Sequence, residues 1–84
     1  MTINEYMGKY GHQGKVGEGK YLTLSIPIRT SRNLTARQVW YYPKQDAVKI
    51  WCDNPRTLHC SLLCWDNAPK TLKKKIIDQL LAFD

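Results

Sequence analysis

Alternation of apolar and polar residues along positions 21–28 is the feature that most constrains the fold. The apolar residues fall at every second position: Leu22, Leu24, Ile26 and Ile28. This period of two is typical of a strand that buries one face and leaves the other in water. Pro27 has no N–H to donate, which predicts that this end of the strand lies at a sheet edge.

Two turn signals divide the following residues into three more predicted strands, at 37–42, 47–52 and 57–65. A four-residue first turn predicts three cross-strand pairs: Tyr42 with Ala47, Trp40 with Lys49, and Gln38 with Trp51. A three-residue second turn predicts Cys52 opposite Leu58 and Ile50 opposite Cys60. A slip of one residue in either hairpin would exchange the two faces.

These registers predict one apolar face and one face rich in aromatic rings. The apolar face holds Val39, Tyr41, Val48, Ile50, Cys52, Leu58, Cys60, Leu62 and Cys64. The other face holds Tyr21, Thr23, Gln38, Trp40, Tyr42, Lys49, Trp51, His59, Ser61 and Trp65. The apolar face needs a covering layer.

An amphipathic helix near the carboxyl end supplies that layer. Asp66 or Asn67 is predicted to cap it, and Pro69 suits its first turn. Its apolar stripe contains Leu72, Ile76, Leu80 and Phe83. The predicted fold is α+β: a four-stranded antiparallel β-meander, flat or curled toward an SH3-like barrel, with one C-terminal α-helix packed on one face.

The first twenty residues differ from the rest of the chain. All five glycines lie between Gly8 and Gly19. Thr2 as a cap and Glu5 three residues later predict about one helical turn, which the glycines limit in length. We expect 1–20 to form a flexible Gly-rich N-terminal arm, and 21–84 to form a single domain. In one alternative, the arm folds back over the aromatic rings.

Charge and composition narrow the class of partner. Thirteen Lys and Arg against seven Asp and Glu give a net charge of +6, which favours a polyanionic partner. No apolar run reaches the roughly 18 residues that span a bilayer, and no signal-peptide core is apparent. We therefore expect a cytoplasmic protein with no membrane partner, whose three cysteines remain free thiols.

A cluster of lysines opens the C-terminal helix: Lys70, Lys73, Lys74 and Lys75. The helix dipole disfavours cations at this end by roughly 0.3–1 kcal/mol each. Exposed N–H groups and lysines together form a suitable place for a phosphate. The alternative is that these lysines are simply the solvated side of an amphipathic helix.

The aromatic face is the second candidate site. Trp40, Tyr42, Trp51 and His59 are predicted to stack on bases or wedge between them, because aromatic rings bind bases without sequence preference. Arg37 and Lys49 are predicted to contact phosphates. A protein-binding face fits the same aromatics, since Trp, Tyr and Arg dominate interface hot spots.

Chemistry at the cysteines is not expected. Cys52, His59, Cys60 and Cys64 lack the pair spacing of zinc sites, and His59 and Cys60 point to opposite faces of a regular strand. We predict no metal, no cofactor and no catalytic residue.

Several segments resemble parts of known families. Gln38-Val39-Trp40, Trp51-Cys52-Asp53-Asn54 and the segment 66–72 resemble the second half of small archaeal chromatin proteins, which implies a groove-contacting Trp40. The segments 15–20 and 26–29 are similar to the opening of swapped-hairpin DNA-binding regulators. Lysines at the start of a last helix resemble double-stranded RNA-binding domains. All three resemblances imply nucleic acid.

The sequence therefore predicts a small basic, non-enzymatic nucleic-acid-binding protein, for DNA or RNA. The alternative is a small protein-binding inhibitor or adaptor of phage or plasmid type, acting through the aromatic face.

Overall fold

The computed structural model describes residues 2–14, 19–30, 33–54, 56–57 and 59–80. Its strands are β1 (His12–Gln13), β2 (Lys20–Arg29), β3 (Thr35–Tyr42), β4 (Ala47–Asp53) and β5 (Cys60–Cys64). Its helices are α1 (Ile3–Tyr10), the single 3-10 turn η1 (Trp65–Asn67) and α2 (Lys70–Gln79). The strands form one antiparallel sheet in chain order, from β1 to β5.

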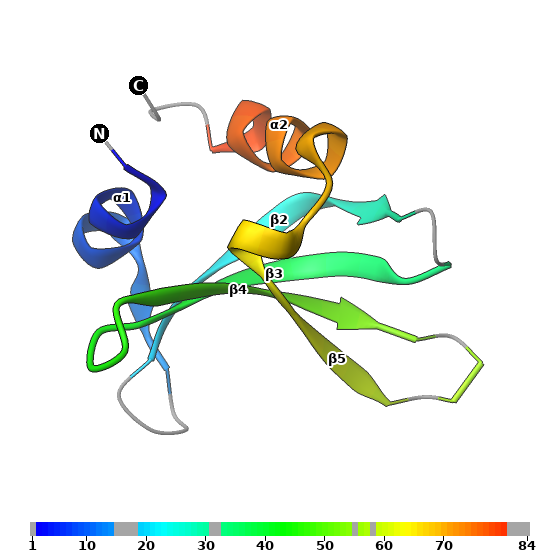
Figure 1. Ribbon diagram of the computed structural model, residues 1–84, viewed down its shortest axis with the longest axis horizontal. Coiled ribbons are helices and arrows are strands. Elements are labelled where there is room, and N and C mark those ends of the chain that lie inside the picture. Colours follow the sequence, from blue (N-terminus) through cyan, green and yellow to red (C-terminus); the bar gives the residue numbers. More distant parts are fainter. Residues whose placement is uncertain (1, 15–18, 31–32, 55, 58, 81–84) are drawn as a thin grey trace.

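The α+β class and the antiparallel meander with a C-terminal helix are confirmed (Figure 1). The prediction of four strands and one helix was incomplete, because it lacked α1 and β1. Both elements come from the first twenty residues, which we expected to form an arm. Residues 15–18 of that predicted arm lie outside the described residues.

The register of the β3–β4 hairpin is confirmed. The structure pairs Tyr42 with Ala47, Trp40 with Lys49, and Gln38 with Trp51. The four-residue turn closes through N–H groups of Gln45 and Asp46, which donate to the carbonyls of Tyr42 and Pro43 at 3.1 and 3.2 Å. Asp46 has a φ of 47°, a left-handed conformation that Asp adopts more readily than most residues.

The register of the β4–β5 hairpin was wrong. Cys52 pairs with Ser61 and Ile50 pairs with Leu63. The connection is longer than predicted, because β5 begins at Cys60 rather than at residue 57. The shift is of three residues, and an odd shift exchanges inward and outward side chains.

Regular alternation fails in the middle of β2. Its register against β3 shifts between Thr23 and Ile28, so the segment between them bulges away from the ladder. Ile26 is 69% exposed there, although the alternation predicted it on the covered face. Gln79 of α2 holds the bulge: its Nε2 donates to the Ile26 carbonyl at 2.7 Å, and the Ile26 N–H donates to its Oε1 at 3.1 Å.

Both helices lie on the same side of the sheet (Figure 1). The core between helices and sheet contains Ile3, Tyr6, Met7, Leu24, Ile28, Ala36, Val39, Val48, Ile50, Cys52, Ala68, Leu72 and Ile76. The Tyr6 hydroxyl donates to the Leu80 carbonyl at 2.8 Å, which links α1 to the end of α2. The predicted stripe member Phe83 lies outside the described residues.

The predicted cap is confirmed for α1 and is wrong for α2. Thr2 and Glu5 form the complete capping box of α1, and the helix continues to Tyr10 despite Gly8. At α2 the residue before the first turn is Pro69, whereas Asp66 and Asn67, the predicted caps, belong to η1.

Candidate functional site

The side of the sheet opposite both helices carries the candidate site, and we call it the open face. Alternation along the paired strands places on it Tyr21, Thr23, Gln38, Trp40, Tyr42, Lys49, Trp51, Cys60, Leu62 and Cys64. The three β5 residues in this set were predicted on the covered face, and the three-residue shift in β5 explains the error. For the same reason Ser61 lies on the covered side, and Trp65 packs against the core.

Aromatic rings from β2, β3 and β4 form one continuous cluster around Trp40. The Trp40 centroid lies 5.1 Å from Tyr21 and 6.3 Å from Tyr42, with interplanar angles of 25° and 20°. Trp51 is tilted by 49° at 5.7 Å. Each ring therefore restricts the rotation of its neighbours.

Trp40 lies buried at the centre of this cluster, and its neighbours form the exposed part. Only 8% of the residue is exposed. The backbone at Gly14 and Gly19 lies against the indole, because Cβ atoms added there would come within 2.6 and 3.0 Å of its ring carbons. The alternative in which the glycine-rich segment folds back over the rings thus holds at Gly14 and Gly19 for Trp40, while Tyr21, Tyr42 and Trp51 are half-buried.

A groove of about 570 Å³ runs across the open face. Its lining comes from four strands: Tyr21, Gln38, Trp40, Tyr42, Trp51, Cys60 and Leu62. A smaller hollow of about 310 Å³ shares Gln38 and Trp51 with the groove, and Arg37 and Asp53 also line it. Leu62 is 52% exposed, so the β5 wall of the groove is apolar and open to solvent.

Gln38 is the hydrogen-bonding group that borders both hollows. The Trp40 indole N–H donates to Gln38 Oε1 at 3.0 Å, and Gln38 Nε2 donates to Thr23 Oγ1 at 3.3 Å. A glutamine amide offers two donors and two acceptor sites. These two bonds fix its orientation and use half of that capacity.

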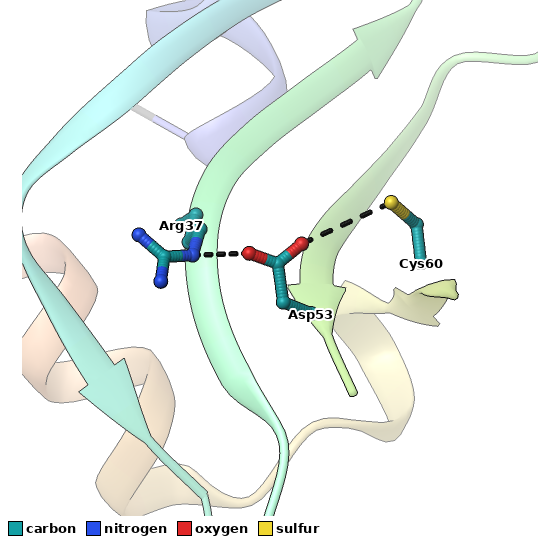
Figure 2. Close-up of polar contacts among 3 residues, drawn as sticks. All are labelled: Arg37, Asp53 and Cys60. Carbon is teal, nitrogen blue, oxygen red and sulfur yellow. Dashed lines mark hydrogen bonds and ion pairs between the residues drawn. The ribbon is translucent and has the colours of Figure 1, made fainter. Parts of the chain in front are cut away.

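Lys49 and Arg37 bring positive charge to the open face. Lys49 Nζ lies 5.5 Å from the Tyr42 centroid, within the range of a cation–π contact. Arg37 forms an ion pair with Asp53, whose other carboxylate oxygen lies 3.8 Å from Cys60 Sγ (Figure 2). The Arg37 charge is therefore partly neutralised by the protein itself.

The predicted lysine cluster belongs to α2, and α2 lies on the side of the sheet opposite the open face (Figure 1). Lys70, Lys74 and Lys75 are exposed, and Lys73 Nζ lies 5.9 Å from the Trp65 centroid. Within the described part of the chain, no carboxylate pairs with these four lysines. The structure thus brings Trp40, Tyr42, Trp51, Lys49 and Arg37 together and separates the α2 lysines from them.

His59 stands apart from both groups. It lies in the β4–β5 connection, where its carbonyl accepts a hydrogen bond from the Asn54 N–H at 3.0 Å. It is exposed but is not part of the groove lining.

The cysteines divide by burial. Burial is the main cause that raises the pKa of the Cys52 thiol, with a smaller contribution from the charge of Asp53. Cys52 therefore stays a protonated core thiol. Cys60 and Cys64 are exposed on the open face. Among the described residues, no cluster of three His, Cys, Asp or Glu side chains is arranged to hold a metal.

Several residues that shape the groove were not in the predicted site. The alternation placed Tyr21 and Gln38 on the correct face. Cys60 and Leu62 were placed on the wrong face, because the predicted second turn was too short. Little in the sequence indicates that Gly14 and Gly19 contact Trp40, because a cluster of glycines does not show which ring the backbone approaches.

Comparison with protein-family models, curated sequences and solved structures finds no match. No helix within the described ranges is both long and apolar enough to cross a bilayer.

Proposed function

We propose that this chain is a non-enzymatic nucleic-acid-binding protein whose open face contacts bases. The observation that carries the proposal is the groove lined by half-buried rings on the helix-free side of the sheet, in a chain with a net charge of +6. Each base stacked on an aromatic ring contributes about 1–3 kcal/mol. The net charge raises the local concentration of a polyanion and speeds its association.

The α2 lysines form a second, separate surface in this proposal. They remain predicted phosphate contacts for two reasons. No carboxylate of the described residues pairs with them, and they lie together at the start of a helix. The sheet and the core lie between them and the rings. A nucleic acid must therefore pass around the edge of the molecule to use both surfaces.

The protein-binding alternative is favoured by one specific observation. Among the described residues, Lys49 and Arg37 are the cations placed beside the rings, and Arg37 is already paired with Asp53. An apolar groove with an exposed Leu62 is also typical of the core of a protein interface. The adaptor or inhibitor function would use this groove and leave the α2 lysines unused.

Salt dependence of binding distinguishes the two functions. We expect labelled DNA or RNA to bind at about 50 mM salt, with log affinity falling by about 0.7–0.9 for each phosphate contact per decade of salt. For a nucleic acid that binds at the α2 surface, the joint change Lys73→Gln, Lys74→Gln and Lys75→Gln should flatten this slope by up to about 2–3 if all three lysines contact phosphates. Lys9→Gln, in α1, is the single-charge control.

An absence of binding to duplex DNA, single-stranded DNA and RNA at low salt would overturn the proposed function. The protein-binding alternative would then be the better account of the groove.

A further inference from the structure

The open face carries features that select among forms of nucleic acid, and the following inference rests on the proposed function. Its rings already pack against one another without a ligand. Trp40 contacts three other rings and the backbone at Gly14 and Gly19. Little side-chain freedom remains to be lost on binding, which is the advantage of a preorganised site. Such rigid rings favour flat partners that can lie against them.

The free hydrogen-bonding capacity of Gln38 points to the edge of a base. Its amide borders the groove and the smaller hollow beside Trp51, with one donor and one acceptor site uncommitted by the two described bonds. In a duplex, the pairing edges of the bases are engaged and the ring faces are stacked. Unpaired bases present both to a protein.

The distribution of charge argues against a duplex on this face. Duplex binding depends strongly on neutralising many phosphates. Here Lys49 stands near Tyr42 and Arg37 is held by Asp53, while the α2 lysines lie behind the sheet. The cations described on this face allow one or two phosphate contacts, which can guide a single strand over a stacking surface but are few for holding a duplex.

We propose that the open face binds single-stranded nucleic acid, with unpaired bases stacked on Tyr42 and Trp51, Gln38 at a base edge and Lys49 near the backbone. The preference arises from the ring faces rather than from phosphate contacts. Affinity should therefore depend on the presence of bases, and only weakly on salt.

Three labelled probes of about 12 nucleotides, a length within the range of single-strand binding sites, test this. They are a mixed-sequence single strand, its perfect duplex, and an abasic strand that keeps every phosphate but has no bases. We expect anisotropy titrations to show at least about tenfold tighter binding of the single strand than of either control. Its salt slope should be about −0.7 to −1.4, for one or two contacts.

Variants assign the effect to the open face. Trp51→Ala removes a stacking ring and should weaken single-strand binding by about 5- to 150-fold. Lys49→Gln should weaken single-strand binding more than Lys9→Gln does. Both lysine changes remove one positive charge, but Lys9 lies in α1 on the covered side.

Alkylation of the unaltered protein gives a readout that does not depend on a variant folding. Cys60 lines the groove and Cys64 does not, although both thiols are exposed, and Cys52 is buried. A saturating single strand should slow the reaction of Cys60 with iodoacetamide at least about fivefold, and more than it slows that of Cys64.

Equal affinity for the duplex or the abasic strand, or an unprotected Cys60 at saturation, would overturn the inference. In those cases the protein still binds nucleic acid, so the proposed function survives through another surface such as the α2 lysines. If none of the probes and no RNA binds at low salt, both proposals fail together.

Discussion

Gly14 shows how a single position with no side chain shapes the open face. Its backbone lies so close to Trp40 that an added Cβ would come within 2.6 Å of the indole Cζ3 and 3.1 Å of the Gly19 carbonyl. Real Cβ atoms do not approach other atoms so closely, so either the indole or the chain at Gly14 must move. Gly8 is different: a Cβ there would meet Tyr41 at 3.6 Å, an ordinary contact.

We therefore expect opposite effects from the same substitution at the two glycines. Gly14→Ala should destabilise the protein by about 1–3 kcal/mol, the usual cost of overpacking. Gly8→Ala replaces a glycine within α1 and should stabilise the protein by about 0.5–1 kcal/mol. Urea unfolding followed by circular dichroism measures both. Wild-type stability in Gly14→Ala would show that the indole is not covered as described.

At the scale of elements, the bulge of β2 and its attachment to α2 are the least regular feature. The Gln79 amide makes both hydrogen bonds to the backbone of Ile26 that a neighbouring strand would otherwise make. One side chain thus satisfies backbone groups that the bulge leaves without a partner strand. The Ile26 side chain is left exposed, so little apolar burial holds this segment in place.

Loss of this amide should release the bulge. We expect Gln79→Ala to cost about 1–2 kcal/mol, since each net hydrogen bond contributes about 0.5–1.5 kcal/mol, and to speed hydrogen exchange of the Ile26 amide. Gln79→Glu keeps an acceptor for the Ile26 N–H but turns a carboxylate oxygen toward the Ile26 carbonyl, and the repulsion between them should also release the bulge. Lys74→Ala, on the exposed side of α2, should stay within about 0.5 kcal/mol of wild type. Unchanged Ile26 exchange in Gln79→Ala would contradict this account.

The elements that sequence reasoning predicted well are those set by local signals. The Thr2–Glu5 capping box and the Pro43–Asp46 turn each depend on residues within a few positions, and both appear as predicted. The start of β5 depends on how many residues the second turn uses, and composition does not determine that number. The same error moved Leu62 and Cys60 to the wrong face and left them out of the predicted site.

For the molecule as a whole, stability should depend on pH through hydrogen bonds to two carboxylates, Asp46 in the β3–β4 turn and Glu5 at the start of α1. Hydrogen bonds from Asn4 Nδ2 and then from the Tyr41 hydroxyl to Asp46 Oδ1, at 3.0 and 2.9 Å, lower the pKa of Asp46 below its usual 3.8. The backbone N–H and hydroxyl of Thr2 likewise lower the pKa of Glu5 below 4.5. The Asp46 contact raises the pKa of Tyr41 above 10.

The direction of each shift sets the pH range of its contribution. Carboxylates with lowered pKa values stabilise the fold above their usual pKa values, and this contribution is lost as pH falls through the lower folded values. The tyrosine contribution is present below pH 10 and is lost as pH rises through its higher folded value. The protein should therefore be less stable at both extremes than near neutrality.

Asp46→Asn tests the acid side, because asparagine also tolerates the left-handed backbone at this position. Its thermal midpoint should lie below that of wild type at neutral pH, and the difference should shrink as pH falls through and below 3.8. Asp66→Asn removes the same charge from an exposed position in η1 and should follow the wild-type curve. A difference for Asp46→Asn that is constant with pH would exclude the charged form as its source.

The placement of the three indoles allows tryptophan fluorescence to report where a ligand binds. Trp40 is enclosed, Trp51 borders the groove, and Trp65 stands on the far side of the sheet beside Lys73. A ligand seated on the rings would quench the emission of Trp51 and leave that of Trp65 unchanged, whereas one held by the α2 lysines would do the reverse. Single Trp→Phe replacements would thus report, without any label, which side of the molecule is occupied.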